Sequence, residues 1–154
     1  MVNIGATATK HQTIIPNLLA AHALTGCDTV ARFAGIGKVK AIKQLDKDLC
    51  LQTLGECNSN MDDVQKEAVT FIAGCYGKCG SSMSDVCYQA WLTKVRTKSV
   101  RKMLTFQNLP PTTDAYAENV KLAHIQECIW KSVLGPDHAA LNPTMCGWIK
   151  DATT

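Results

Sequence analysis

Long apolar runs are missing from this sequence. The most apolar stretch, Ile14–Leu24, is short and is interrupted by Pro16, Asn17 and His22. A helix that spans a bilayer needs about 20 consecutive apolar residues, so the sequence predicts no transmembrane helix and no membrane partner. The same stretch is a poor signal peptide because its apolar region is weak and begins late. We therefore expect an intracellular protein, with the nucleus among the locations left open.

A strong charge of one sign is missing too. The 154 residues include Lys+Arg 16 and Asp+Glu 13, which leaves a formal net charge of only +3. A value this small does not by itself predict a nucleic-acid partner. The content of 46% hydrophobic and 19% charged residues is ordinary for a globular protein, and the length fits one domain. Composition thus disfavours a disordered chain and a coiled-coil rod.

Close pairs of cysteines, such as those of zinc knuckles, are also missing. The eight cysteines would suit four disulfides in a secreted protein, but without a convincing signal peptide we interpret them as reduced and mostly buried thiols. The tightest grouping is Cys75, Cys79 and Cys87, and no second close group accompanies it. Because structural zinc sites commonly draw on two close pairs, the sequence predicts no zinc site.

The sequence predicts an all-α fold that forms a single helical domain over residues 1–154 and lacks an α/β core. Apolar residues recur at helical spacing, Gly and Pro mark the breaks, and no alternating run favours a sheet. Within the domain we expect a helix-hairpin-helix-like element over 16–45, a helical bundle over 60–134 and an irregular tail over 135–154. The individual helices are predicted over 16–24, 38–45, about 60–74, about 82–104 and about 112–134.

Two of these helices carry apolar stripes that we assign to the core. The helix over 82–104 has Cys87, Trp91 and Val95 at helical spacing. The stripe of the longest helix consists of Leu122, Ile125, Ile129 and Val133. All three tryptophans of the chain, Trp91, Trp130 and Trp148, are interpreted as core residues rather than as platforms for stacking bases.

The most specific motif is Gly35-Ile36-Gly37-Lys38, which opens the helix over 38–45. Both glycines are expected to take backbone angles closed to other residues, and the first amides of the helix can then hold a phosphate oxygen. Lysines gather nearby, with no acid between Arg32 and Lys43. We predict a DNA phosphate site formed by Gly35, Ile36, Gly37, Lys38, Lys40 and Lys43. The alternative, an ordinary helical turn with solvated lysines, stays open.

The residues before the hairpin extend this motif. Ala23–Thr29 reads ALTGCDT, and its Asp28 stands seven residues before Gly35. Gly-Cys-Asp followed by Gly-x-Gly resembles the PIN-like 5′-nucleases of the flap endonuclease type, whose helix-hairpin-helix holds duplex DNA. The resemblance implies sequence-independent DNA binding, with Asp28 as a ligand of Mg²⁺. It also implies a potassium ion at the hairpin carbonyls, near Gly35–Gly37.

A wider set of motifs looks like a group of uncharacterised animal proteins associated with mobile elements, which carry a HALTGCDT…GIGK signature. The shared motifs are His22–Thr29, Gly35–Lys38, Leu109–Ala115, Ile129-Trp130 and Gly147-Trp148. This resemblance covers nearly the whole chain, from Ile15 to Lys150. The resemblance implies that these animal proteins are relatives of this chain. It implies no activity, because none is established for them.

Carboxylates are missing where a nuclease would need them. Two-metal hydrolysis uses several carboxylates around two cations about 4 Å apart, and PIN-like nucleases take them mainly from a sheet before the Gly-Cys-Asp motif. No Asp or Glu precedes Asp28. We therefore assign no catalytic residue and expect the helical remnant or fragment of a nuclease relative. An Mg-dependent, structure-specific nuclease would require a missing N-terminal region or a protein partner.

A second acid-free stretch runs from Val86 to Thr113. Within it Lys94, Lys98 and Arg101 share one face of the predicted helix, where they would extend a track for the phosphate backbone. A solvated face of an amphipathic helix explains them equally well. The sequence therefore also leaves open a helical protein-interaction module that binds no nucleic acid, and it leaves the oligomeric state open.

Overall fold

A computed structural model describes residues 4–47, 50–97, 109–134 and 144. These residues form helices, turns and loops without a strand, so the predicted all-α fold is confirmed for this part of the chain. The helices are α1 (Ile4–Lys10), α2 (Ile15–Leu24), α3 (Lys38–Leu45), α4 (Met61–Cys75), α5 (Met83–Thr97) and α6 (Thr113–Leu134). None of them is long and apolar enough to cross a bilayer. The predicted tail over 135–154, with Trp148, lies outside the described residues apart from Thr144.

Side-chain caps stand at the start of three of these helices, close to the predicted starts at about 60, 82 and 112. Asn60 Oδ1 accepts a hydrogen bond from the Asp62 amide at 3.0 Å, and Ser82 Oγ accepts one from the Asp85 amide at 3.2 Å. At the start of α6, Thr112 Oγ1 accepts a hydrogen bond from the Ala115 amide at 3.4 Å. Such caps satisfy amides that have no partner within the helix. Helix α1 is not among the predicted helices, and none of its residues is buried.

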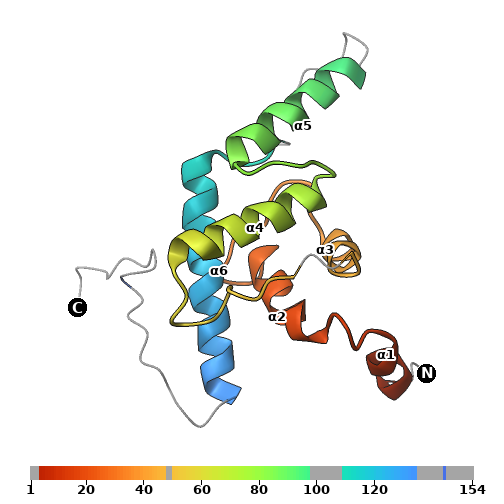
Figure 1. The fold of residues 1–154 in the computed structure, drawn as a ribbon, viewed down its shortest axis with the longest axis vertical. Coiled ribbons are helices and arrows are strands. Elements are labelled where there is room, and N and C mark those ends of the chain that lie inside the picture. The colour runs from red at the N-terminus through yellow and green to blue at the C-terminus, as the bar shows by residue number, and fades with distance from the viewer. Residues whose placement is uncertain (1–3, 48–49, 98–108, 135–143, 145–154) are drawn as a thin grey trace.

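The helices pack around α6, the longest of them (Figure 1). Helices α2, α4 and α5 contact α6, and α3 contacts both α2 and α4. Helix α5 contacts α4 and α6, and its second half projects away from the other helices (Figure 1). The hairpin between α2 and α3 is therefore carried by the best packed part of the molecule.

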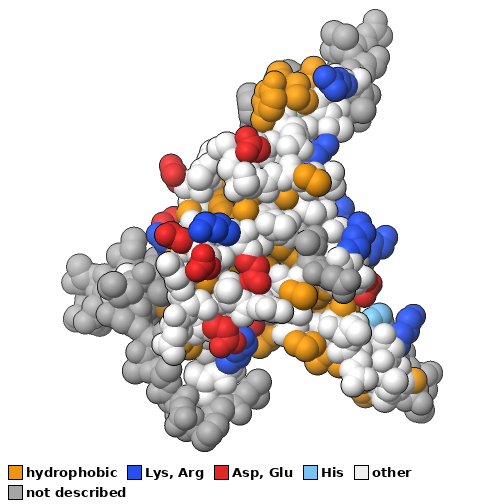
Figure 2. All heavy atoms as spheres, viewed as in Figure 1, with side chains coloured by type: hydrophobic (Ala, Val, Ile, Leu, Met, Phe, Trp, Pro, Cys, Tyr) orange, Lys and Arg blue, Asp and Glu red, His pale blue; other side chains and the backbone are white. Residues whose placement is uncertain are grey.

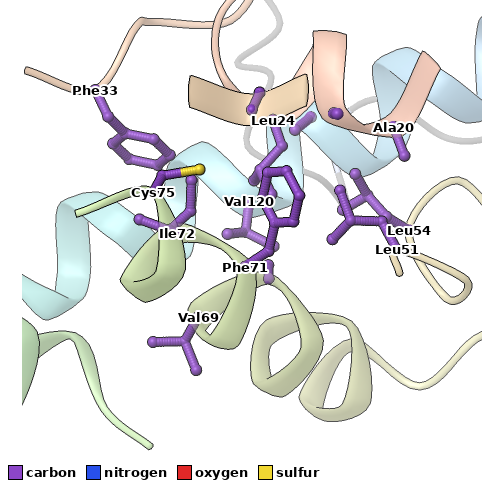
Figure 3. Packing of buried hydrophobic residues seen from close by; sticks show 14 of the residues in the cluster. Ala20, Leu24, Phe33, Leu51, Leu54, Val69, Phe71, Ile72, Cys75 and Val120 are labelled. Carbon is purple, nitrogen blue, oxygen red and sulfur yellow. The ribbon is translucent and has the colours of Figure 1, made fainter. Parts of the chain in front are cut away.

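The core lies where α2, α4 and α6 meet. Figure 3 shows Phe71 of α4 between Leu24 of α2 and Val120 of α6, and each of these side chains is at most 1% exposed. The pattern that buries α4 is visible in its sequence, since Val64, Ala68, Ile72 and Cys75 recur on one face. Of the seven described cysteines, only Cys75 and Cys128 are buried, so the expectation of mostly buried thiols is wrong.

The buried face of α5 differs from the prediction. Met83, Val86 and Ala90 are buried, whereas Trp91 and Val95 are 40% and 44% exposed. The assignment of Trp91 to the core is therefore wrong. Both sets of residues have helical spacing, and a shift of one position along a helix turns the face by about 100°. Met83, Val86 and Ala90 are buried because they face α4 and α6. The spacing of residues in the sequence does not show which face of α5 meets these helices.

At the end of α6, too, the buried residues differ from the predicted apolar stripe. Ile125 is buried as predicted, but Ile129 and Val133 are 38% and 69% exposed. Cys128 is buried, so Ile129 lies on another face of the helix from the one that enters the core. Trp130 is half-buried, and its ring stacks on that of His22 with 5.6 Å between the centroids.

Replacement of Phe71 by alanine tests this core. We expect Phe71→Ala to lower the free energy of unfolding by about 3–5 kcal/mol, since the ring leaves a cavity between three helices. The matched control is Val95→Ala, on the exposed face of α5, for which we expect a change of about 0.5 kcal/mol or less. Urea denaturation followed by circular dichroism measures both, and equal losses for the two variants would contradict this packing of α2, α4 and α6.

Candidate nucleic-acid interface

The hairpin between α2 and α3 turns on two glycines with positive φ. Gly26 has φ +101° and Gly35 has φ +72°. Gly37 is extended, with φ −123°, so the expectation of an unusual backbone angle is right for Gly35 and wrong for Gly37. A Cβ on Gly26 would lie 2.8 Å from Cα of Arg32. The chain therefore folds back on itself closely, and only glycine permits this turn.

Lys38 ties the hairpin to the end of α2. Its ammonium donates to the carbonyl oxygens of His22 at 2.7 Å and Gly26 at 2.5 Å, and to Thr25 Oγ1 at 3.1 Å. The last carbonyls of a helix have no partner within it and carry its negative dipole end. Partial burial lowers the pKa of Lys38. The three bonds use all three donors of the ammonium, so its backbone amide is the group left for a phosphate.

The first turn of α3 is open to solvent. The amides of Lys40 and Ala41 donate to the carbonyl of Gly37, so the amides of Lys38 and Val39 precede the first bond of the helix. Gly37 and Lys38 are exposed, and a Cβ on Gly37 would meet nothing within 4 Å. An anion can therefore approach these amides without a steric obstacle.

The other predicted hairpin residues are held in different ways. Ile36 is only 2% exposed, so its side chain anchors the hairpin in the core and its backbone alone faces a ligand. Lys40 Nζ donates to the carbonyl of Gly35 at 2.6 Å. Lys43 is exposed on the next turn of α3. The six predicted residues thus lie on the hairpin and on α3. Lys40 follows the open amides directly, whereas Lys43 lies in the last turn of the helix.

Three hairpin carbonyls near the predicted potassium site already accept hydrogen bonds. Such a site needs several carbonyl oxygens directed at one point. Here the carbonyl of Ala34 accepts from Tyr76 Oη at 2.9 Å, that of Phe33 accepts from the Ile36 amide, and that of Gly35 accepts from Lys40. An ammonium group already occupies the position at Gly35.

Asp28 lies exposed in the bend that follows α2. Magnesium is bound through several oxygen ligands in near-octahedral geometry. Among the described residues, no three His, Cys, Asp or Glu side chains lie close enough together to hold a metal ion. Within the described part of the chain, Asp28 therefore belongs to no cluster of three such side chains, and its assignment as a magnesium ligand stays a prediction.

Positive side chains gather along one edge of the molecule. Figure 2 shows Lys and Arg following the side of α1, α3 and α5, while Asp and Glu lie mostly over the other half of this view. A hollow of about 460 Å³ between the end of α3, the second half of α4 and the loop after α4 has Lys47 and Lys78 in its wall. Arg96 is exposed on α5. Of the predicted second track, Lys98 and Arg101 and the side chain of Lys94 lie outside the described part.

A polar cluster that the sequence pattern did not predict lies between α6 and the loop before α4. The amide of Gly55 donates to His124 Nδ1 at 3.1 Å, so this histidine is neutral. Lys131 Nζ pairs with Glu56 at 2.8 Å and with Glu127 at 3.3 Å. Glu127 is 1% exposed, and its Oε2 has no hydrogen-bond partner among the described residues. The only sequence signal is helical spacing of polar residues, which is typical of a solvated face.

Burial sets the protonation of this cluster. It raises the pKa of Glu127 to about 7, against the opposing effect of the Lys131 charge. Burial and the Lys131 charge together lower the pKa of His124. A Cβ on Gly55 would lie 2.4 Å from Cδ of Glu127, so the loop reaches α6 only because this residue is glycine. Since His124 and Glu127 are at most 5% exposed, the cluster fastens the loop to α6.

No family model, curated protein or solved structure matches this chain. The resemblance to PIN-like nucleases therefore rests on the motifs at Gly26–Asp28 and Gly35–Lys38. A function has to be inferred from the geometry of these residues.

The bonds of Lys38 give a direct test of its structural role. We expect Lys38→Met to lower the free energy of unfolding by about 1–2 kcal/mol, because the end of α2 loses three hydrogen bonds. Lys43→Met, further along α3, is the control and should change it by about 0.5 kcal/mol or less. Urea denaturation at neutral pH measures both. Equal stability of the two variants would mean that Lys38 does not hold the hairpin.

The buried carboxyl of Glu127 predicts a pH dependence of stability. Its pKa is about 7 in the folded protein, against an ordinary value of 4.5. Between pH 4.5 and pH 7 the folded state therefore binds more protons than the unfolded state does. The free energy of unfolding must then fall as the pH rises from 4.5 through 7. Glu127→Gln should remove this fall. The free energy of unfolding of the variant, relative to that of wild type, should therefore rise by on the order of 2 kcal/mol between pH 5 and pH 8.

The comparison with wild type isolates Glu127 from its neighbours. His124, whose pKa is lowered, makes both proteins less stable as the pH falls below 6.5, and Lys131, Glu56 and Glu67 are present in both. Glu118→Gln, on the exposed side of α6, is the control and should give a flat difference curve. Urea titrations at several pH values supply the curves, and a flat curve for Glu127→Gln as well would refute the assignment.

Proposed function

We propose that this chain is a sequence-independent DNA-binding module, the helical part of a PIN-like nuclease relative, which contacts phosphates through its hairpin. The observation that carries the proposal is the open first turn of α3, where the amides of Lys38 and Val39 precede the first helical bond. Lys40 and Lys43 follow on the same short helix. A helix N-terminus with neighbouring cations attracts a phosphate oxygen by its dipole, its free amides and its charge.

Rigidity of the hairpin supports this proposal. Lys38 fixes one side of it to α2, the side chain of Ile36 is buried, and Tyr76 holds the carbonyl of Ala34. The amides are thus held in place before a ligand arrives, which reduces the entropy lost on binding. Backbone amides carry no information about base sequence, so binding through them would be independent of sequence.

The proposal is restricted to binding. The described residues bring no set of carboxylates to Asp28, and a phosphodiester cleavage step needs several of them around its metal ions. Cleavage would therefore require acids from a further segment of a longer protein or from another chain. In such an assembly the hairpin would hold the DNA while the other part supplies the chemistry.

A helical protein-interaction module is the second candidate, and an exposed stripe on α5 favours it. Tyr88 and Trp91 are 61% and 40% exposed, with their rings stacked at 6.2 Å between centroids. Val95 continues the stripe by one turn. Exposed aromatic side chains on one face are typical of surfaces that bind partners.

Reversal of charge at the hairpin tests the DNA proposal. We expect Lys40→Glu with Lys43→Glu to weaken binding of a fluorescent duplex of about 20 base pairs by about tenfold or more at about 50 mM salt, and to reduce the salt dependence of binding. Two duplexes of unrelated sequence should behave alike. Fluorescence anisotropy at about 50 mM and about 200 mM salt measures the affinities.

The control carries the same change of net charge elsewhere. Lys66→Glu with Lys121→Glu alters two side chains on α4 and α6, each of which pairs with an acid of its own helix. This variant should bind DNA about as well as wild type does. Equal losses in both double variants would point to net charge alone, and absence of binding by wild type at low salt would rule the proposal out.

A further inference from the structure

An apolar groove lies between the first three helices. It has a volume of about 490 Å³, and its walls include Ile4 of α1, Ile15 and Leu18 of α2, and Ile42 of α3. A second hollow of about 270 Å³ shares Leu18 and Ile42 with it and continues to Lys38. The two hollows therefore form one groove that follows α2 and α3.

The walls of this groove are unusually exposed for aliphatic side chains. Ile4 is 81% exposed, Ile15 is 47% exposed, and Leu18 and Ile42 are 37% and 36% exposed. Hydrophobic side chains are visible at the surface in the part of the molecule formed by α1 and α2 (Figure 2). A single helix as short as α1 is marginal in water on its own, and none of its residues is buried. The described residues thus leave this face uncovered.

The charge around the groove indicates the kind of partner. Residues 1–45 contain a single acid, Asp28, and five basic residues, which are Lys10, Arg32, Lys38, Lys40 and Lys43. Lys10 of α1 and Lys43 of α3 are exposed on the helices that form the walls. A second copy that docked the same face would bring like charges together, which disfavours self-association through it. A partner with acidic residues would complement the positive charge of these helices.

We propose that the groove binds an amphipathic helix of a protein partner, with the apolar face of that helix between α1 and α3 and acidic residues on its flanks. A concave aliphatic groove accepts the ridge formed by residues i, i+3 or i+4, and i+7 of a helix, and it fits such a ridge better than a flat lipid surface. The flanking acids would then be attracted by the positive charge of α1 and α3. This inference does not depend on DNA binding, and its test contains no nucleic acid.

Two synthetic peptides serve as the probe. Both are helical, about 15 residues long, and share one leucine face, and they carry either Glu or Lys on the flanks. Fluorescence anisotropy should show at least about tenfold tighter binding of the acidic peptide. Ile4→Ser with Ile15→Ser should weaken that binding by about tenfold, because these side chains line the groove and are already exposed. Val95→Ser with Val133→Ser, which removes two exposed valines elsewhere, should leave it unchanged.

Three results would overturn the inference. These are equal binding of the two peptides, no binding of the acidic peptide at millimolar concentration, and equal binding by wild type and the Ile4 and Ile15 double variant. Vesicles of phosphatidylserine and phosphatidylcholine test the lipid alternative, and stronger binding of vesicles than of peptide through Ile4 and Ile15 would assign the groove to a membrane surface. Circular dichroism establishes that each variant is folded.

Discussion

The ammonium of Lys38 is the contact on which the hairpin depends. It lies against the last turn of α2, where it takes up the carbonyls of His22 and Gly26 and the hydroxyl of Thr25. A helix end with unpaired carbonyls needs donors, and here the donor comes from the first residue of the next helix. One side chain thus completes α2 and fixes the start of α3. The close return of the chain at Gly26 onto Arg32 leaves no room for a Cβ there.

Because of this contact, Lys38 has a different role from Lys40 and Lys43. The side chain of Lys38 stabilises the fold. In the proposed DNA-binding function, attraction of a phosphate would therefore fall to the backbone amides of the first turn and to the charges of Lys40 and Lys43. Backbone amides on a fixed turn are good ligands for an anion because they need no ordering when it binds. The two glycines also differ in purpose, since Gly35 supplies a positive φ and Gly37 leaves space over the amides.

Local signals predicted five of the six described helices, whereas the buried faces and the partners of single side chains depend on non-local contacts. The caps at Asn60, Ser82 and Thr112 depend on neighbouring residues, so the starts of three helices could be read from the sequence. The buried face of α5 depends on α4 and α6, which is why spacing alone assigns Trp91 to the wrong side. The hairpin motif was recognisable from its glycines. The partners of Lys38, by contrast, lie 12 to 16 residues before it, and Gly55 meets His124 from 69 residues away.

The two proposals draw on the same positive charge. Helix α3 carries the open amides at its first turn, the charges of Lys40 and Lys43, and one wall of the apolar groove. It lies in a region with Asp28 as the only acid over residues 1–45. A DNA backbone and an acidic helix bound there together would place like charges near each other at a distance where screening is incomplete. Each ligand would therefore weaken the other, and linkage requires the two effects on affinity to be equal in size. A partner that occupies the groove would then lower DNA binding without touching the hairpin itself.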